Sequence, residues 1–271
     1  MLGKLIYYET KAFGRIMLPL YAAALAFSLF MGLGLRIIPA DLLEGLPYIL
    51  MFMIYTFLIL AVMIMTGVLS VTRFYNNLLG REGYLMFSLP TGTLSLIGSK
   101  VISVLIWSAL SGLAALLTVI LCGLGAGGMY FLREIPSLFR FLAEWKDLPS
   151  ALALTGTTLV FLAVTAAASI VRIYAAIAIG HQFNGHRIAW SVVAYIAFQI
   201  IETMIGSLFG LFAHSMSPFE TWVESFSRFF EAETVSAMLL VEWWAVLGSA
   251  VFIVIFGLLT WFLLDRRLNL E

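Results

Sequence analysis

Charged residues are scarce in this chain. Asp, Glu, Lys and Arg make up 11% of its 271 residues, whereas hydrophobic residues make up 62%. Soluble domains carry about 25% charged and about 45–50% apolar residues, so this chain cannot hide its apolar surface inside a water-soluble core. The shortage of charge excludes an ordinary soluble fold and predicts an all-α integral membrane protein.

The formal net charge is +0, and the chain contains 1 cysteine. A neutral chain has no basic field that attracts phosphates, so we expect no nucleic-acid partner. Cys122 cannot form an internal disulfide bond and is expected to be a small core residue.

Signatures of catalysis are also missing. The stretch Gly92–Lys100, GTLSLIGSK, does not have the spacing of a phosphate-binding loop, so we expect that the chain cannot hydrolyse ATP by itself. His181 and His186 have no carboxylate between them, and we expect them in a solvated turn and not at a metal. The sequence predicts no catalytic residue, no metal site and no cofactor in this chain, and no intramembrane enzyme.

Long apolar runs dominate what remains, because a helix needs about 20 apolar residues to cross a bilayer. Six windows qualify and predict six transmembrane helices in a single membrane domain covering residues 1–271. The predicted spans are residues 17–35, 48–70, 101–124, 152–179, 188–212 and 243–264. Pro19 is expected in the first turn of the first span, where proline is tolerated.

The distribution of basic residues predicts the orientation. With the N-terminus inside, ten of the 15 Lys and Arg residues lie at inner ends, which by the positive-inside rule predicts that both termini are cytoplasmic. The inner ten are Lys4, Lys11, Arg15, Arg73, Arg81, Lys100, Arg172, Arg187, Arg266 and Arg267.

Three stretches outside the spans have amphipathic patterns. Residues 1–15 carry Lys4, Lys11 and Arg15 on one helical face, which predicts a helix in the inner interface with its cations at anionic headgroups. Residues 132–146 and 219–230 predict short outer helices. Either these outer helices merely cover the outer face of the bundle or they act in gating or substrate contact.

Residues 71–100 form the polar segment between the second and third spans. Here turn residues alternate with large hydrophobic ones, in RFYNNLLGREGYLMFSLPTGTLSLIGSK (Arg73–Lys100). A solvated linker does not need so many aromatics, and a buried span does not tolerate Arg81-Glu82 beside glycine. The segment is therefore expected at the membrane edge with an apolar face that contacts a partner or the headgroups.

Four stretches together resemble bacterial ABC-2-type transporter permeases. They are LGKLIYYETKAFGRIMLPLY, FYNNLLGREGYLMFSLPTGTLSLIGSKVISVLIW, IYAAIAIGHQFNGHRIAWSVVAYIAF and the ending RRLNLE. The resemblance covers essentially the whole length, although none of these stretches is a catalytic signature. It implies a six-span subunit of an exporter in the bacterial cell membrane, whose ATPase is a separate chain.

The resemblance also implies a role for each part. Residues 1–15 correspond to an elbow helix and 71–100 to a cytoplasmic coupling loop that seats in the ATPase; the long outer loop between the third and fourth spans departs from compact members. The implied partners are the ATPase, which binds ATP and Mg, and a second permease copy or paralogue. The implied coupling residues are Phe74, Tyr75, Leu78, Arg81, Glu82, Gly83, Tyr84, Phe87 and Pro90.

An alternative is a transporter or channel that works without an ATPase, which should show internal repeats and broken spans. We find no convincing repeat in the sequence. The substrate cannot be read from the sequence under either hypothesis.

Two ionisable residues fall within predicted spans, Arg172 in the fourth and Glu202 in the fifth. Such residues are costly in lipid and face the bundle interior or water. Glu202, with Gln199, is a candidate for the substrate path, or else an acid that is hydrogen-bonded between helices. Depths counted along the helices predict that Arg172 and Glu202 are too far apart for a direct pair.

Overall fold

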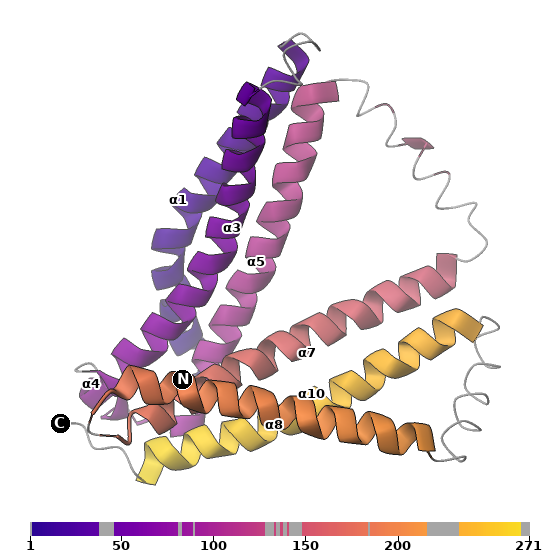
Figure 1. Ribbon diagram of the computed structural model, residues 1–271. Coiled ribbons are helices and arrows are strands. Elements are labelled where there is room, and N and C mark those ends of the chain that lie inside the picture. Colours follow the sequence, from indigo (N-terminus) through magenta and orange to yellow (C-terminus); the bar gives the residue numbers. More distant parts are fainter. Residues whose placement is uncertain are drawn as a thin grey trace. The chain divides into compact units, whose positions relative to one another are not determined.

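The computed structural model describes residues 2–37, 46–80, 83–88, 90–127, 133, 136–137, 140, 148–183, 185–215 and 233–266. In these ranges every regular element is a helix (Figure 1). Six of the described helices are long and apolar enough to cross a membrane, as predicted. They are α1 (Leu2–Ile37), α3 (Leu46–Phe74), α5 (Thr93–Gly127), α7 (Leu148–Gly180), α8 (Arg187–Ser215) and α10 (Glu233–Arg266).

Each predicted span lies inside one of these helices, but the helices are longer. The third predicted span, residues 101–124, lies inside α5, which begins at Thr93 and ends at Gly127. The extensions are less apolar than the spans, so hydropathy alone stops short of them. Backbone hydrogen bonding continues the helix until a turn residue interrupts it.

Helix α1 is uninterrupted from Leu2 to Ile37, so the expected separate helix over residues 1–15 is not confirmed. Its buried positions recur every three or four residues from Glu9 to Gly32, which means that one face is packed along nearly the whole helix. The prediction for Pro19 was wrong, because the residue lies in the helix interior and not in a first turn. Proline there lacks the N–H that the carbonyl of Arg15 would otherwise accept.

The chain divides into two compact units. The first comprises Met1–Thr72 and Gly98–Trp145, and the second comprises Arg73–Ile97 and Lys146–Glu271. Helices α3 and α5 each run from one unit into the other, so the segment between them belongs to the second unit. Each unit is described separately below.

Side-chain contacts with α5 hold the first unit together. Tyr21 Oη of α1 and Ser111 Oγ of α5 lie 2.7 Å apart, and Thr66 Oγ1 of α3 lies 2.8 Å from the same Ser111 oxygen. Phe13 stacks on Trp107 with ring centroids 6.3 Å apart. Gly32 of α1 and Gly125 of α5 pass so closely that a Cβ on Gly125 would lie 2.8 Å from the Gly32 Cα. Small residues thus allow α1 and α5 to approach each other.

In the second unit α7 packs against both α8 and α10. Much of α7 from Ala167 to Ala178 is buried, and its alanines allow close helix approach. Phe198 of α8 meets Phe256 of α10 with ring centroids 4.7 Å apart. At the turn between α7 and α8, a Cβ on Gly180 would lie 2.6 Å from the Arg187 carbonyl oxygen, so only glycine fits.

The two predicted outer amphipathic stretches cannot be compared with the structure. Residues 219–230 lie outside the described residues, and residues 132–146 do so apart from four isolated positions. Both therefore remain predictions.

Candidate functional site

The segment that links α3 to α5 consists of short helical pieces. Helix α3 ends in a π-helical turn, η1 (Tyr75–Leu79), which is followed by the five-residue helix α4 (Gly83–Phe87). Gly80 terminates η1, and its N–H donates to the Tyr75 carbonyl at 2.8 Å. A π turn widens the helix locally and is frequently found at functional sites. The segment is therefore structured and not a loose loop.

The base of the segment is buried in the second unit. Phe74 is 0% exposed and stacks on Tyr174 of α7, with ring centroids 3.9 Å apart and planes at 8°. Leu78 is also 0% exposed. Both residues were predicted to contact an ATPase, but in this structure they anchor the segment to its own unit. The sequence shows that this region is rich in aromatic residues, but not which of them face inward.

Two further contacts fix the segment. Tyr75 meets His181, in the turn after α7, edge to face at 6.2 Å between ring centroids. At the other end, Thr93 Oγ1 donates to Asp265 Oδ1 of α10 at 3.1 Å. The segment is thus attached to α7, to the turn between α7 and α8, and to the last turn of α10.

His181 was expected in a solvated turn, and this prediction was wrong for His181 because its side chain is buried. Burial lowers the pKa of its imidazole, and the positive charge of Arg187 lowers the pKa further. The ring is therefore neutral at neutral pH and acts as an apolar partner for Tyr75. His186 is exposed, as expected.

The tip of the segment is exposed. Tyr84 is 73% exposed and Leu85 is 67% exposed, both on α4. Tyr84 was predicted as a contact residue, whereas Leu85 was not. Pro90 is exposed, Phe87 is partly exposed and Gly83 is buried. Arg81 and Glu82 lie outside the described residues, so their predicted role is untested.

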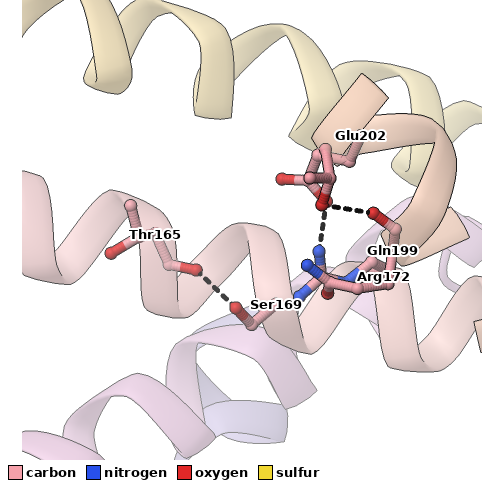
Figure 2. A network of polar contacts seen from close by, with 6 residues as sticks. Thr165, Ser169, Arg172, Gln199 and Glu202 are labelled. Carbon is pink, nitrogen blue, oxygen red and sulfur yellow. Dashed lines mark hydrogen bonds and ion pairs between the residues drawn. The ribbon is translucent and has the colours of Figure 1, made fainter. Parts of the chain in front are cut away.

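A second candidate site lies between α7 and α8. Arg172 Nη1 forms an ion pair with Glu202 Oε2, and the two side chains point toward each other (Figure 2). The prediction that they are too far apart was wrong. The count of depth along each helix axis ignored the long reach of the arginine side chain.

The surroundings of this pair are partly polar. The Arg172 guanidinium lies 5.3 Å from the ring centroid of Tyr195, and its Nε has no hydrogen-bond partner among the described residues. One turn before Arg172, Ser169 Oγ donates to the Thr165 carbonyl at 2.9 Å (Figure 2). Gln199 has an exposed side chain, so it and Glu202 are not brought together in a closed pocket.

Exposure distinguishes the two members of this pair. The side chain of Arg172 is 10% exposed and that of Glu202 is 25% exposed. A carboxylate that is partly open within a span can exchange its arginine partner for a cationic or hydrogen-bonding group that enters. The geometry can therefore serve a substrate path, and it equally satisfies a structural acid between helices, so both interpretations remain open.

Sequence analysis missed two other acids that are held between helices. Glu9 Oε1 of α1 accepts a hydrogen bond from Lys100 Nζ of α5 at 2.7 Å, in the first unit. Glu242 of α10 accepts hydrogen bonds from Thr157 and Thr158 of α7 at 2.7 and 2.6 Å. The sequence marks Glu9 and Glu242 only as ionisable residues within or beside an apolar helical run. It does not identify their hydrogen-bond partners.

Within the described residues, no three His, Cys, Asp or Glu side chains are grouped so that they could hold a metal ion. No protein-family model, curated protein or solved structure matches the chain.

Proposed function

We propose that the chain is the membrane-spanning permease subunit of an ATP-driven exporter, coupled to a separate ATPase chain through the segment Arg73–Ile97. The observation that carries this proposal is the division of the segment into a buried base and an exposed apolar tip. Phe74 at the base is 0% exposed, whereas Tyr84 at the tip is 73% exposed. A loop that only connects two helices needs neither a buried base nor an exposed apolar tip.

The buried base suits the transmission of movement. A motor that closes on nucleotide must push a stiff element attached to the transmembrane helices, since a flexible loop transmits no displacement. Stacking of Phe74 on Tyr174 ties the segment to α7, and the hydrogen bond from Thr93 to Asp265 ties it to α10. The segment is also covalently continuous with α3 and α5. A push on it is therefore delivered to four of the six long helices.

The exposed tip suits a protein contact. Tyrosine is enriched among the few residues that dominate binding at interfaces, and a neighbouring leucine extends the apolar patch. In this proposal Tyr84 and Leu85 enter a groove of the ATPase, while Arg81 and Glu82 pair with charges at its rim. Phe74 and Leu78 contribute rigidity and no contact.

The remaining parts of the proposal follow the resemblance. The permease works with a second copy or a paralogue, in the bacterial cell membrane with both termini cytoplasmic, and the ATPase supplies the sites for ATP and Mg. The bias of Lys and Arg toward the predicted inner ends supports this orientation. Glu202 supports a polar substrate path because its charged side chain lies in a candidate span and is 25% exposed.

The tip is tested by the double substitution Tyr84→Ala/Leu85→Ala. We expect at least a tenfold loss of ATPase activity that co-purifies with the tagged chain, because each substitution removes about 2 kcal/mol or more at a hot spot. The measurement is ATP hydrolysis in the purified sample, with the subunit identified by mass spectrometry. The matched control is Tyr8→Ala/Leu113→Ala, which removes an exposed tyrosine and an exposed leucine elsewhere.

Unchanged co-purification of the double variant removes the segment from the coupling role. A stronger result against the proposal is directional solute transport by the purified chain in nanodiscs or vesicles without any ATPase. That outcome favours a transporter or channel that works without an ATPase.

A further inference from the structure

A cavity of about 440 Å³ opens on the first unit between α1 and α5. Six of its seven lining residues lie on one side of α1, next to the buried face of that helix, and the seventh comes from α5. One of the six is Gly14. The others are Tyr7, Thr10, Lys11, Arg15 and Leu18 of α1 and Trp107 of α5. The volume is within the range of sites that hold small molecules. The proposed coupling mechanism makes no use of this cavity.

Two basic residues are among those that line the cavity. Lys11 and Arg15 are one helical turn apart, both are exposed, and neither forms an ion pair within the described part of the chain. The Lys11 Nζ lies 5.9 Å from the ring centroid of Tyr7, which also lines the cavity. Two neighbouring positive charges without an acidic partner in the described ranges create a local field that favours an anion.

The floor of the cavity is made of carbon. Leu18 and the indole of Trp107 form it, and Gly14 leaves it open, since a Cβ on Gly14 would lie 3.3 Å from the Trp107 ring. Thr10 Oγ1 and Trp107 Nε1 are buried and have no hydrogen-bond partner among the described residues. An apolar lining beside two basic side chains suits a ligand with an apolar part next to a negative charge.

The length of α1 gives the depth of these charges. Residues 16–37, which follow Arg15, extend about 33 Å at about 1.5 Å per residue, close to the hydrocarbon thickness of about 30 Å. If this part of α1 crosses the hydrocarbon, Lys11 and Arg15 lie at the level of the lipid headgroups. Leu18, one turn further, then lies at the level of the first acyl carbons.

We propose that this cavity is a binding site for an anionic phospholipid, with the phosphate at Lys11 and Arg15 and the start of an acyl chain over Leu18 and Trp107. Free phosphate shares the anionic part of this chemistry, but it gains nothing from the carbon floor. A zwitterionic lipid brings its own cation to the site and gains less from the two basic residues. The site therefore selects lipids with a net negative headgroup, and this selection does not depend on any ATPase.

The test uses the full chain in nanodiscs of equal parts phosphatidylglycerol and phosphatidylcholine, followed by extraction and quantification of retained lipid by native mass spectrometry. We expect retained phosphatidylglycerol to exceed retained phosphatidylcholine. In the Lys11→Gln/Arg15→Gln variant, retained phosphatidylglycerol should fall about tenfold or more, because each cation near an anionic lipid contributes roughly fivefold in affinity. Both residues are exposed, so the variant keeps the buried contacts of α1.

The matched control is Lys4→Gln/Arg36→Gln, which removes two exposed charges from the same helix without touching the cavity. Equal loss in both variants means diffuse surface attraction and overturns the proposal. A third sample, purified without lipid, is titrated with inorganic phosphate. If phosphate binds there as tightly as the lipid and depends equally on Lys11 and Arg15, the site takes free phosphate and the lipid proposal fails.

Discussion

An ion pair joins two helices in each of the two units, and the two pairs differ in their access to the outside. The side chains of Lys100 and Glu9 in the first unit are 4% and 9% exposed. Those of Arg172 and Glu202 in the second unit are 10% and 25% exposed. Both pairs consist of one cation and one acid from different helices, so burial is the property that distinguishes them.

Burial determines what an ion pair can do. A closed pair has already lost its water, and separating it leaves a charge in an apolar environment, so it acts as a fixed link between helices. A pair with an accessible acid can exchange partners at lower cost, since water or a ligand replaces the cation. The comparison therefore assigns a structural role to Glu9 and Lys100 and makes Glu202 the better functional candidate.

The largest effect is expected from Lys100→Met. It removes the ammonium group that lies 2.7 Å from Glu9 Oε1 in a buried site. Breaking such a pair costs about 3–5 kcal/mol, which corresponds to a fall in apparent Tm on the order of 10 °C. Thermal unfolding of the detergent-solubilised protein, followed by tryptophan fluorescence, measures this.

A rescue experiment serves as the control for this prediction. In the double variant Glu9→Gln/Lys100→Met both members of the pair are neutral, so most of the lost stability should return. If the double variant is as unstable as Lys100→Met alone, the packing of the lysine stem and not the charge pair holds α1 to α5, and the contrast between the two pairs weakens.

An intermediate effect on stability is expected from Glu202→Gln. The amide keeps the shape and can still accept a hydrogen bond from Arg172, and the site is open enough for water to reach it. We expect a loss of about 1–2 kcal/mol, smaller than for Lys100→Met. If Glu202 lies on the substrate path, transport with the ATPase present should fall far more than the amount of folded protein does.

The informative measurement is therefore a ratio. Transport is divided by the amount of folded chain from fluorescence-detected size exclusion, for Glu202→Gln and for Lys100→Met. A lower ratio for Glu202→Gln than for Lys100→Met supports the functional assignment. Equal ratios, or unchanged transport in Glu202→Gln, mean that Glu202 is a structural acid between α7 and α8.

The sequence predicts the spans well because hydropathy over about 20 residues is a local property. Every predicted window lies inside one long helix, as 101–124 lies inside α5. Which residues pair across helices is not local. Glu9 and Lys100 are 91 residues apart, and no periodicity connects them. Arg172 and Glu202 were each noticed, but the wrong geometric assumption separated them.

The segment between α3 and α5 shows the same limit. Its composition predicted an apolar contact face, because turn residues and large hydrophobic residues alternate there. The composition could not show that Phe74 is covered by Tyr174 while Leu85 is exposed, since that division depends on α7, about a hundred residues further along the chain. A prediction of contact residues therefore needs the partner helix as well as the segment.

The smallest effect on stability is expected from removing the threonine hydroxyls that donate to Glu242. Glu242 accepts hydrogen bonds from Thr157 at 2.7 Å and from Thr158 at 2.6 Å, and the Thr158 hydroxyl also lies 2.8 Å from the Leu154 carbonyl. Each hydroxyl has a single proton, so it bonds to either the carboxylate or the backbone at one time.

The substitutions Thr157→Val and Thr158→Val should each cost about 1 kcal/mol of stability, less than the loss of a cation from either ion pair. The control is Thr155→Val, whose exposed hydroxyl donates to the Ala151 carbonyl at 2.8 Å and has no other partner among the described residues. Its expected Tm change is near zero. If Thr155→Val lowers Tm as much as Thr158→Val does, the hydrogen bonds from Thr157 and Thr158 to Glu242 do not contribute measurably to the stability of the protein.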